Sequence, residues 1–236
     1  MVIAIHGSVM VNILAIVPAY NEAQCIKNTI EELTACCPNI DYLVINDGSR
    51  DNTADICRRE HFNYLNVPIN CGLSSGFQAG MKYAHRHGYE AVVQFDADGQ
   101  HRPESIMPMY EHMQITNADI VIASRFCDGT RPTGARGAGS KLISALIKLF
   151  AHVKIYDPTS GMRMFNAKLI NAYAHSFDLA PEPDALAFFA RKGAHIEEIP
   201  TVMRERQGGE SYFNLKSIIA YMSRTCLSII LFQWFR

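Results

Sequence analysis

Apolar runs and helix-period segments alternate along the first half of the chain. Short runs with few polar residues predict five buried β-strands, at residues 12–20, 41–47, 63–68, 91–98 and 119–126. The segments between them carry apolar residues at helical spacing and end near Pro or Gly. Because the strands are apolar throughout rather than alternating, we expect an α/β fold with a mostly parallel, Rossmann-like sheet flanked by helices on both faces.

The pattern changes after residue 126. Residues 127–140 are rich in Gly and Arg and predict a loop, and an apolar helix is expected from Lys141. A turn and strand over 157–166, two helices and a final strand from residue 196 complete the pattern. We interpret the chain as one domain rather than two, because no linker or internal repeat divides it.

Polar side chains follow four of the predicted strands, at the points where those strands end. They form the groups Tyr20-Asn21-Glu22, Asp47-Gly48-Ser49, Asp96 to Asp98, and Ser124-Arg125. In sheets of this kind, ligands bind beyond the carboxyl ends of the strands. The four groups therefore predict one shared cleft.

Asp96 and Asp98 are two carboxylates at the end of an apolar strand. They repel each other unless a cation lies between them, and hard divalent ions accept oxygen ligands while keeping positions open for phosphate. The pair therefore predicts Mg²⁺ or Mn²⁺ bridging a diphosphate, with Gln100 as a further oxygen ligand. A solvated Asp-Gly turn is the alternative.

The composition indicates which binding partners and which cellular compartment to expect. The 236 residues include 22 Lys and Arg and 23 Asp and Glu, so no global charge attracts nucleic acid. Seven cysteines show no metal-binding or disulfide pattern, and residues 1–12 lack the features of a signal peptide. We therefore expect a cytoplasmic protein without structural disulfides or zinc, in which residues 1–9 are an extension.

Six motifs in this order resemble the family 2 glycosyltransferases of GT-A fold. They are "IVPAYNEA", "VINDGSRDNT", "FDADGQHRPE", "ASRF", "TSGMRMFN" and "RERQGGESY". The similarity extends over about residues 11–213 and is greatest to the polyprenyl-phosphate (dolichyl-phosphate-type) sugar transferases. It implies an inverting, metal-dependent transfer from a nucleotide-sugar, a UDP-sugar in our interpretation, to a polyprenyl phosphate or a lipid-linked glycan, in the synthesis of cell-surface polysaccharide.

The resemblance also implies how the chain is divided. Residues 10–126 would bind the nucleotide-sugar, residues 127–213 would bind the acceptor as part of the same domain, and residues 214–236 would form an amphipathic terminal helix. On the donor side it implies a nucleotide pocket and a metal site, formed by Pro18, Ala19, Tyr20, Glu22, Asp47, Asp96, Asp98 and Gln100. Within this set, Asp47 would meet the edge of the base and Glu22 would lie near the ribose.

On the acceptor side, the resemblance implies a phosphate-binding group of cations and hydroxyls, formed by Arg125, Arg136, Ser140, Arg206 and Ser211. Asp184 is the implied base, with Glu182 as its competitor. A sugar hydroxyl acceptor would need such a base, whereas a lipid phosphate is already an anion and needs cations instead. The sequence departs from the family pattern at Leu73 and Tyr212, where a basic residue is usual, and does not decide between the two acceptors.

Residues 215–236 carry apolar residues at helical spacing with basic residues around them. The pattern fits an amphipathic helix on the cytoplasmic face of a membrane, and equally a helix docked on the core or in a dimer. A small transmembrane partner would supply the rest of an anchor, and a homo-oligomer is left open.

Two other functions compete with transfer to a lipid. A nucleotidyltransferase would need a basic Gly-rich loop after the first strand, where this chain has "PAYNEAQC". A non-catalytic nucleotide-binding partner of a membrane complex would keep the fold without the chemistry, and the intact pair of aspartates argues against it.

Overall fold

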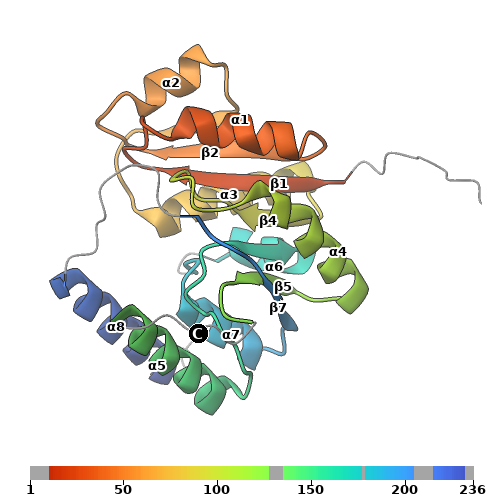
Figure 1. Cartoon of the computed structure of the whole chain (residues 1–236), viewed down its shortest axis with the longest axis vertical. Helices are drawn as coiled ribbons and strands as arrows, with labels where there is room; N and C mark the ends of the chain where they lie inside the picture. Colours follow the sequence, from red (N-terminus) through yellow and green to blue (C-terminus); the bar gives the residue numbers. More distant parts are fainter. Residues whose placement is uncertain (1–10, 128–134, 177–178, 205–214, 232–236) are drawn as a thin grey trace, which may run out of the picture.

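The computed structural model describes residues 11–127, 135–176, 179–204 and 215–231. Within these residues one sheet has seven strands in the order β3-β2-β1-β4-β6-β5-β7 (Figure 1). The strands are β1 Ile13–Ala19, β2 Asp41–Asp47, β3 Tyr64–Val67, β4 Ala91–Gln94, β5 Ile120–Ser124, β6 Arg163–Asn166 and β7 Ile196–Pro200. The α/β fold with a mostly parallel sheet, predicted from the apolar runs, is confirmed.

β6 is the exception to parallel pairing. It lies between β4 and β5 and runs antiparallel to both, while the other neighbours pair in parallel. β1, β2, β4 and β5 therefore all point the same way. Their carboxyl ends meet at one edge of the sheet, as the predicted cleft requires.

Helices cover both faces of the sheet. They are α1 Ile26–Cys36, α2 Thr53–Arg59, α3 Leu73–His87, α4 Ile106–Thr116, α5 Ala135–Ala151, α6 Ala167–Ala174, α7 Pro183–Arg191 and α8 Leu215–Ile230, with a short 3₁₀ turn at Pro103–Ser105. Alternate residues of β1 serve two different cores: Ile13 packs with the α1 and α4 side, and Leu14 with the α3 and α6 side. Burial on both faces explains why the strands are apolar throughout.

α5, α7 and α8 pack together beside the sheet (Figure 1). α5 begins at Ala135 rather than near Lys141, so the interpretation of residues 135–140 as loop was wrong. The reason is tertiary: a Cβ at Gly139 would lie 3.1 Å from the Met222 side chain of α8. The glycine that indicated a loop instead lets two helices approach each other closely.

α8 is docked on the protein through one of its faces. Ile229 is fully buried, Thr225 is 1% exposed, and Met222 packs against the core. Leu227, in contrast, is 50% exposed. Among the described residues no helix combines the length and apolar character that a membrane span requires.

Candidate active site

Hydrogen bonds connect the turn after β1 to the turn after β2. Asn21 has a left-handed backbone (φ 57°), which is uncommon for a residue other than glycine. Its N–H donates to Ser49 Oγ at 3.0 Å, and its Oδ1 accepts the Arg50 N–H at 2.8 Å. The N–H of Glu22 donates to Thr53 Oγ1 at 2.9 Å. The predicted nucleotide-pocket segment, Pro18 to Glu22, therefore has a fixed course at the sheet edge.

Asp47 ends β2 and is almost fully buried. Its two carboxylate oxygens accept the backbone N–H groups of Cys71, at 2.8 Å, and Gly72, at 2.7 Å. Asp47 thus holds the loop that leads into α3, a contact that the sequence patterns did not reveal. Its contact with the edge of a nucleobase remains a prediction.

β4 ends at Gln94, so the acidic residues lie in a turn beyond the sheet edge rather than in the strand predicted to reach residue 98. Thr29 Oγ1 of α1 donates to the Ala97 carbonyl at 3.0 Å and ties this turn to the helix beneath it. Oδ1 of Asp96 accepts the side-chain amide of Gln94 at 3.1 Å. The turn is held from both sides.

Asp98 and Gln100 occupy the far side of the same turn. Asp98 is 9% exposed, and its Oδ1 accepts the Gln100 N–H at 3.1 Å. The Gln100 carbonyl accepts the Arg204 N–H at 3.0 Å, which joins the turn to the segment after β7. The three residues predicted to hold a metal are therefore within one short turn.

The chemistry of this turn suits a hard divalent cation. Two carboxylates and a side-chain amide are oxygen donors of the kind that Mg²⁺ and Mn²⁺ prefer. Among the described residues, no three His, Cys, Asp or Glu side chains gather into a metal site. A cation here would have few protein ligands and would share its coordination with substrate oxygens, which is typical of Mg²⁺ bound with a phosphate.

Arg125, which follows β5, is engaged by Asp157. Its Nε and Nη2 donate to the two oxygens of this fully buried carboxylate, both at 2.7 Å. Nη2 also donates to Thr159 Oγ1 at 2.9 Å, which lies 3.5 Å from Ser140 Oγ. Arg125 and Ser140, two predicted phosphate ligands, are thus brought to one place. The sequence patterns missed the acidic partner.

The segment that carries Asp157 is fixed by a second carboxylate. Glu198 of β7 accepts the N–H groups of Tyr156, at 2.6 Å, and Asp157, at 2.8 Å. Burial raises the pKa of Glu198, and these hydrogen bonds to the ionised form act in the opposite direction. The Arg125–Asp157 pair is therefore presented by a constrained loop.

Arg163, at the start of β6, is 2% exposed. Its guanidinium donates to three backbone carbonyls: Ser160 at 2.8 Å, Pro158 at 2.7 Å and Pro181 at 3.1 Å. Burial lowers the pKa of Arg163, and nearby groups that include Asp157 and Asp184 oppose that shift. This one side chain connects the loop of Asp157 to the segment that enters α7.

The two candidate bases at the start of α7 have different partners on α8. Both oxygens of Glu182 accept from Arg224 Nη2 at 2.7 Å. Asp184 is 9% exposed, and its Oδ2 accepts the Ser228 hydroxyl at 2.6 Å. Glu182 is thus paired with a cation and Asp184 with a hydroxyl, and the choice of either as the base remains a prediction.

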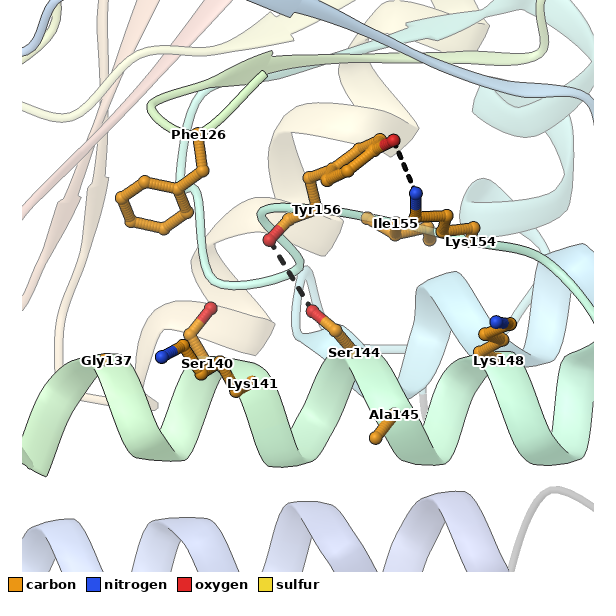
Figure 2. Close-up of a pocket in the computed structure, with 10 residues that line it drawn as sticks. All are labelled: Phe126, Gly137, Ser140, Lys141, Ser144, Ala145, Lys148, Lys154, Ile155 and Tyr156. Atoms are coloured by element: carbon orange, nitrogen blue, oxygen red, sulfur yellow. Dashed lines mark hydrogen bonds between the residues drawn. The ribbon is translucent and has the colours of Figure 1, made fainter. Parts of the chain in front are cut away.

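A pocket of about 210 Å³ lies between α5 and the segment after it. Figure 2 shows Phe126 and Tyr156 facing α5 across this pocket from Ser140 and Ser144. Lys148 and Lys154 lie at the end remote from Ser140. The pocket combines apolar walls with hydroxyl and amine groups and fits a ligand that is part anionic and part apolar.

Several predicted residues are beyond what the structure describes in full. The backbone of Arg136 lies in the first turns of α5, four residues before Ser140, and its side chain is outside the described residues. Arg206 and Ser211 also lie outside them. Their predicted contacts with phosphate remain predictions.

The fold is of the GT-A type that glycosyltransferases have. Glucosyl-3-phosphoglycerate synthase from Mycobacterium tuberculosis, solved with Mn²⁺, UDP-glucose and phosphoglyceric acid, has the same fold. It superposes with a TM-score of 0.67 at 19% identity, over 94% of this chain and 79% of that one.

The family model "Glycosyl transferase family 2" matches residues 14–174, and the chain belongs to that family of glycosyltransferases. An undecaprenyl-phosphate mannosyltransferase from Micrococcus luteus is 30% identical over 84% of this chain and 86% of its own length. A polyprenol monophosphomannose synthase from Mycolicibacterium smegmatis is 25% identical over 84% of this chain and 79% of its own length.

Proposed function

We propose that this glycosyltransferase moves a sugar from a UDP-sugar to a polyprenyl phosphate, with inversion and with Mg²⁺ or Mn²⁺, in the synthesis of cell-surface glycans. The observation that carries the proposal is the meeting of two groups at one sheet edge. The Asp96–Asp98 turn lies on one side, and Thr159, which is hydrogen-bonded to both Arg125 and Ser140, lies in the segment on the other side. The names of the relatives from M. luteus and M. smegmatis support a polyprenyl-phosphate acceptor.

On the donor side, Asp96, Asp98 and Gln100 would hold the cation together with the diphosphate. The cation, when bound, would stabilise the negative charge that develops on the departing nucleoside diphosphate. The chain's own contribution is positional, because backbone and side-chain bonds fix the acidic turn before substrate arrives.

On the acceptor side, a lipid phosphate needs cations more than it needs a base. Ser140 and Arg136 are one helical turn apart on α5, and Arg125 is adjacent through Thr159. A guanidinium binds phosphate oxygens in bidentate fashion. The apolar walls at Phe126 and Tyr156 suit the first isoprene units beyond the phosphate.

A lipid-linked glycan is the second candidate acceptor, since its sugar hydroxyl must lose a proton. Asp184 is the group that favours this reaction. It lies in the first turn of α7, and its competitor Glu182 is held by Arg224. Asp184→Asn would remove nearly all turnover if a hydroxyl is the nucleophile and would leave most of it if a phosphate is.

Peripheral contact with the cytoplasmic face of an anionic membrane completes the proposal. Neither α5 nor α8 contains an acidic residue, and the whole of residues 129–156 lacks Asp and Glu. α5 exposes Leu142 and Leu149, at 50% and 65%, together with Lys148, and α8 exposes Leu227 at 50%. Apolar and basic side chains together favour an anionic bilayer surface. A small transmembrane partner would strengthen such a contact.

The test is a screen of UDP-, GDP- and dTDP-sugars with Mn²⁺, with and without polyprenyl phosphate, that follows both donor hydrolysis and lipid product. We expect lipid-linked sugar from a UDP-sugar only, and none after chelation of the metal. Transfer from another nucleotide would correct the donor. Nucleotide binding without any turnover would support a non-catalytic partner of a membrane complex instead.

A further inference from the structure

His101 is a buried histidine directly beside Asp96. It is 3% exposed, and its ring packs edge-on against Phe95 with the ring centroids 5.8 Å apart. Its Nδ1 accepts the backbone N–H of Asp96 at 2.9 Å. A buried imidazole is costly unless its nitrogens are used, and this one supports the backbone of a predicted metal ligand.

The other ring nitrogen faces the side chain of the same residue. Because Nδ1 is an acceptor, the proton of the neutral ring is on Nε2. Nε2 lies 3.5 Å from Asp96 Oδ2. His101 therefore contacts Asp96 at its backbone and at its carboxylate, and restricts the rotation of the side chain between them.

Gly161 closes the opposite side of Asp96. A Cβ at this position would lie 2.8 Å from Asp96 Oδ2 and 3.3 Å from His101 Nε2. The φ of Gly161 is not positive, so glycine is required here for space and not for backbone freedom. Gly161 belongs to the loop that also holds Asp157 and Thr159, the partners of Arg125.

We propose that His101 and Gly161 are positioning residues that hold the Asp96 carboxylate in its metal-binding orientation and join the donor turn to the acceptor loop. This rests on the proposed function, in which Asp96 shares a cation with the nucleotide. Groups that orient a metal ligand change metal affinity by about 10–100-fold when they are removed. The effect should appear in metal binding itself, before any turnover.

The experiment titrates Mn²⁺ into the full chain with saturating UDP and follows free Mn²⁺ by electron paramagnetic resonance. Gly161→Ala and His101→Phe should each weaken Mn²⁺ binding by about tenfold or more. His101→Asn should restore most of it, because Asn Oδ1, like His Nδ1, is bonded to Cγ and can accept the Asp96 N–H. UDP affinity without metal should stay unchanged in all three.

Gly76→Ala is the matched control, because its Cβ would meet only Ile45 Cγ2, at 3.4 Å. Wild-type Mn²⁺ affinity in folded Gly161→Ala or His101→Phe protein would overturn the proposal, as would loss of binding in His101→Asn equal to that in His101→Phe. The two variants are independent, so one that fails to fold leaves the other as the test. Wild-type protein that binds no Mn²⁺ with UDP would instead contradict the proposed function.

Discussion

The proposed donor and acceptor sides of the site hold their charged groups in different ways. On the donor side, carboxylates accept backbone N–H groups: Asp47 from the loop before α3, and Asp98 from Gln100 of its own turn. On the acceptor side, charged side chains are held by opposite charges. Arg125 is paired with Asp157, and Glu182 with Arg224 of α8.

This difference indicates which part of the site is preformed. Backbone amides have little freedom to move, so we expect the donor carboxylates to be positioned before substrate binds. An ion pair can be exchanged, because a phosphate offers a guanidinium the same bidentate geometry as a carboxylate. We infer that the donor turn binds without rearrangement, and that the acceptor phosphate shares Arg125 with Asp157.

The largest effect should come from the preformed side. Asp98→Ala removes a carboxylate from the turn while the surrounding bonds to Thr29 and Gln94 persist. We expect kcat/KM to fall by about a thousandfold or more, consistent with loss of several kcal/mol of charge stabilisation. Steady-state kinetics with varied Mn²⁺ would measure it.

Asp55→Ala is the control for this variant, because Asp55 is exposed and its ion pair is with Arg58 on the same helix, α2. Metal-dependent activity near the wild-type level in folded Asp98→Ala protein would reject the metal role of the acidic turn.

Arg136→Ala should act on the acceptor alone. Loss of one charge-assisted contact to phosphate costs about 2 kcal/mol, or roughly 30-fold in affinity. We expect the KM for polyprenyl phosphate to rise by that factor while the KM for the nucleotide-sugar is unchanged. Arg86→Ala, at an exposed position of α3, is the control. A change in donor KM alone would place Arg136 on the donor side.

Leu142→Ser with Leu149→Ser should release the chain from vesicles that contain phosphatidylglycerol. Each exposed leucine that enters the acyl boundary contributes about 1.5–3 kcal/mol, so the partition coefficient should fall by at least about tenfold in a flotation assay. Donor hydrolysis in detergent should stay unchanged. Deletion of residues 215–236 is a poorer test, because α8 buries Ile229 in the core.

Ile115→Ser controls for the loss of exposed apolar surface, because Ile115 is 80% exposed on α4. Unaltered flotation of the double leucine variant would place the membrane contact on another surface.

Asp119→Asn should have the smallest effect on catalysis, because Asp119 precedes β5 at the edge of the sheet opposite the site. Burial alone would raise the pKa of Asp119, but hydrogen bonds from His195, Asn166 and Lys168 outweigh it and lower the pKa below 3.8. The ionised group therefore stabilises the fold above about pH 4, and this contribution is lost as pH falls through the folded-state pKa.

We expect the free energy of unfolding of the variant to be about 1–2 kcal/mol lower than that of the wild type at pH 7. Near pH 3 this difference in the free energy of unfolding should be smaller. Urea denaturation at the two pH values would measure both. A difference that is equal at the two pH values would show that packing, rather than ionisation, accounts for the loss.

The sequence predicted the donor side more fully than the acceptor side. Asp47 ends β2, and Asp96 and Asp98 lie just beyond β4, so local pattern was enough to place all three at one edge. The partners of Arg125 and Glu182 come from segments 32 and 42 residues away. The spacing of apolar and polar residues does not reveal contacts between segments so far apart. The predicted start of α5 was wrong for the same reason, because it depends on the contact of Gly139 with Met222 of α8.

The apolar strands and the polar residues at their ends determine an α/β sheet with its polar groups at one edge. The local sequence pattern is enough for this, because it reports both the burial and the direction of the strands. Only the tertiary structure decided that α8 docks on α5, that Asp157 neutralises Arg125, and that His101 and Gly161 enclose Asp96. The last two contacts come from the segment that leads into β6, which lies antiparallel between β4 and β5. That position of β6 brings residues 157–163 against a turn about 60 positions earlier in the chain.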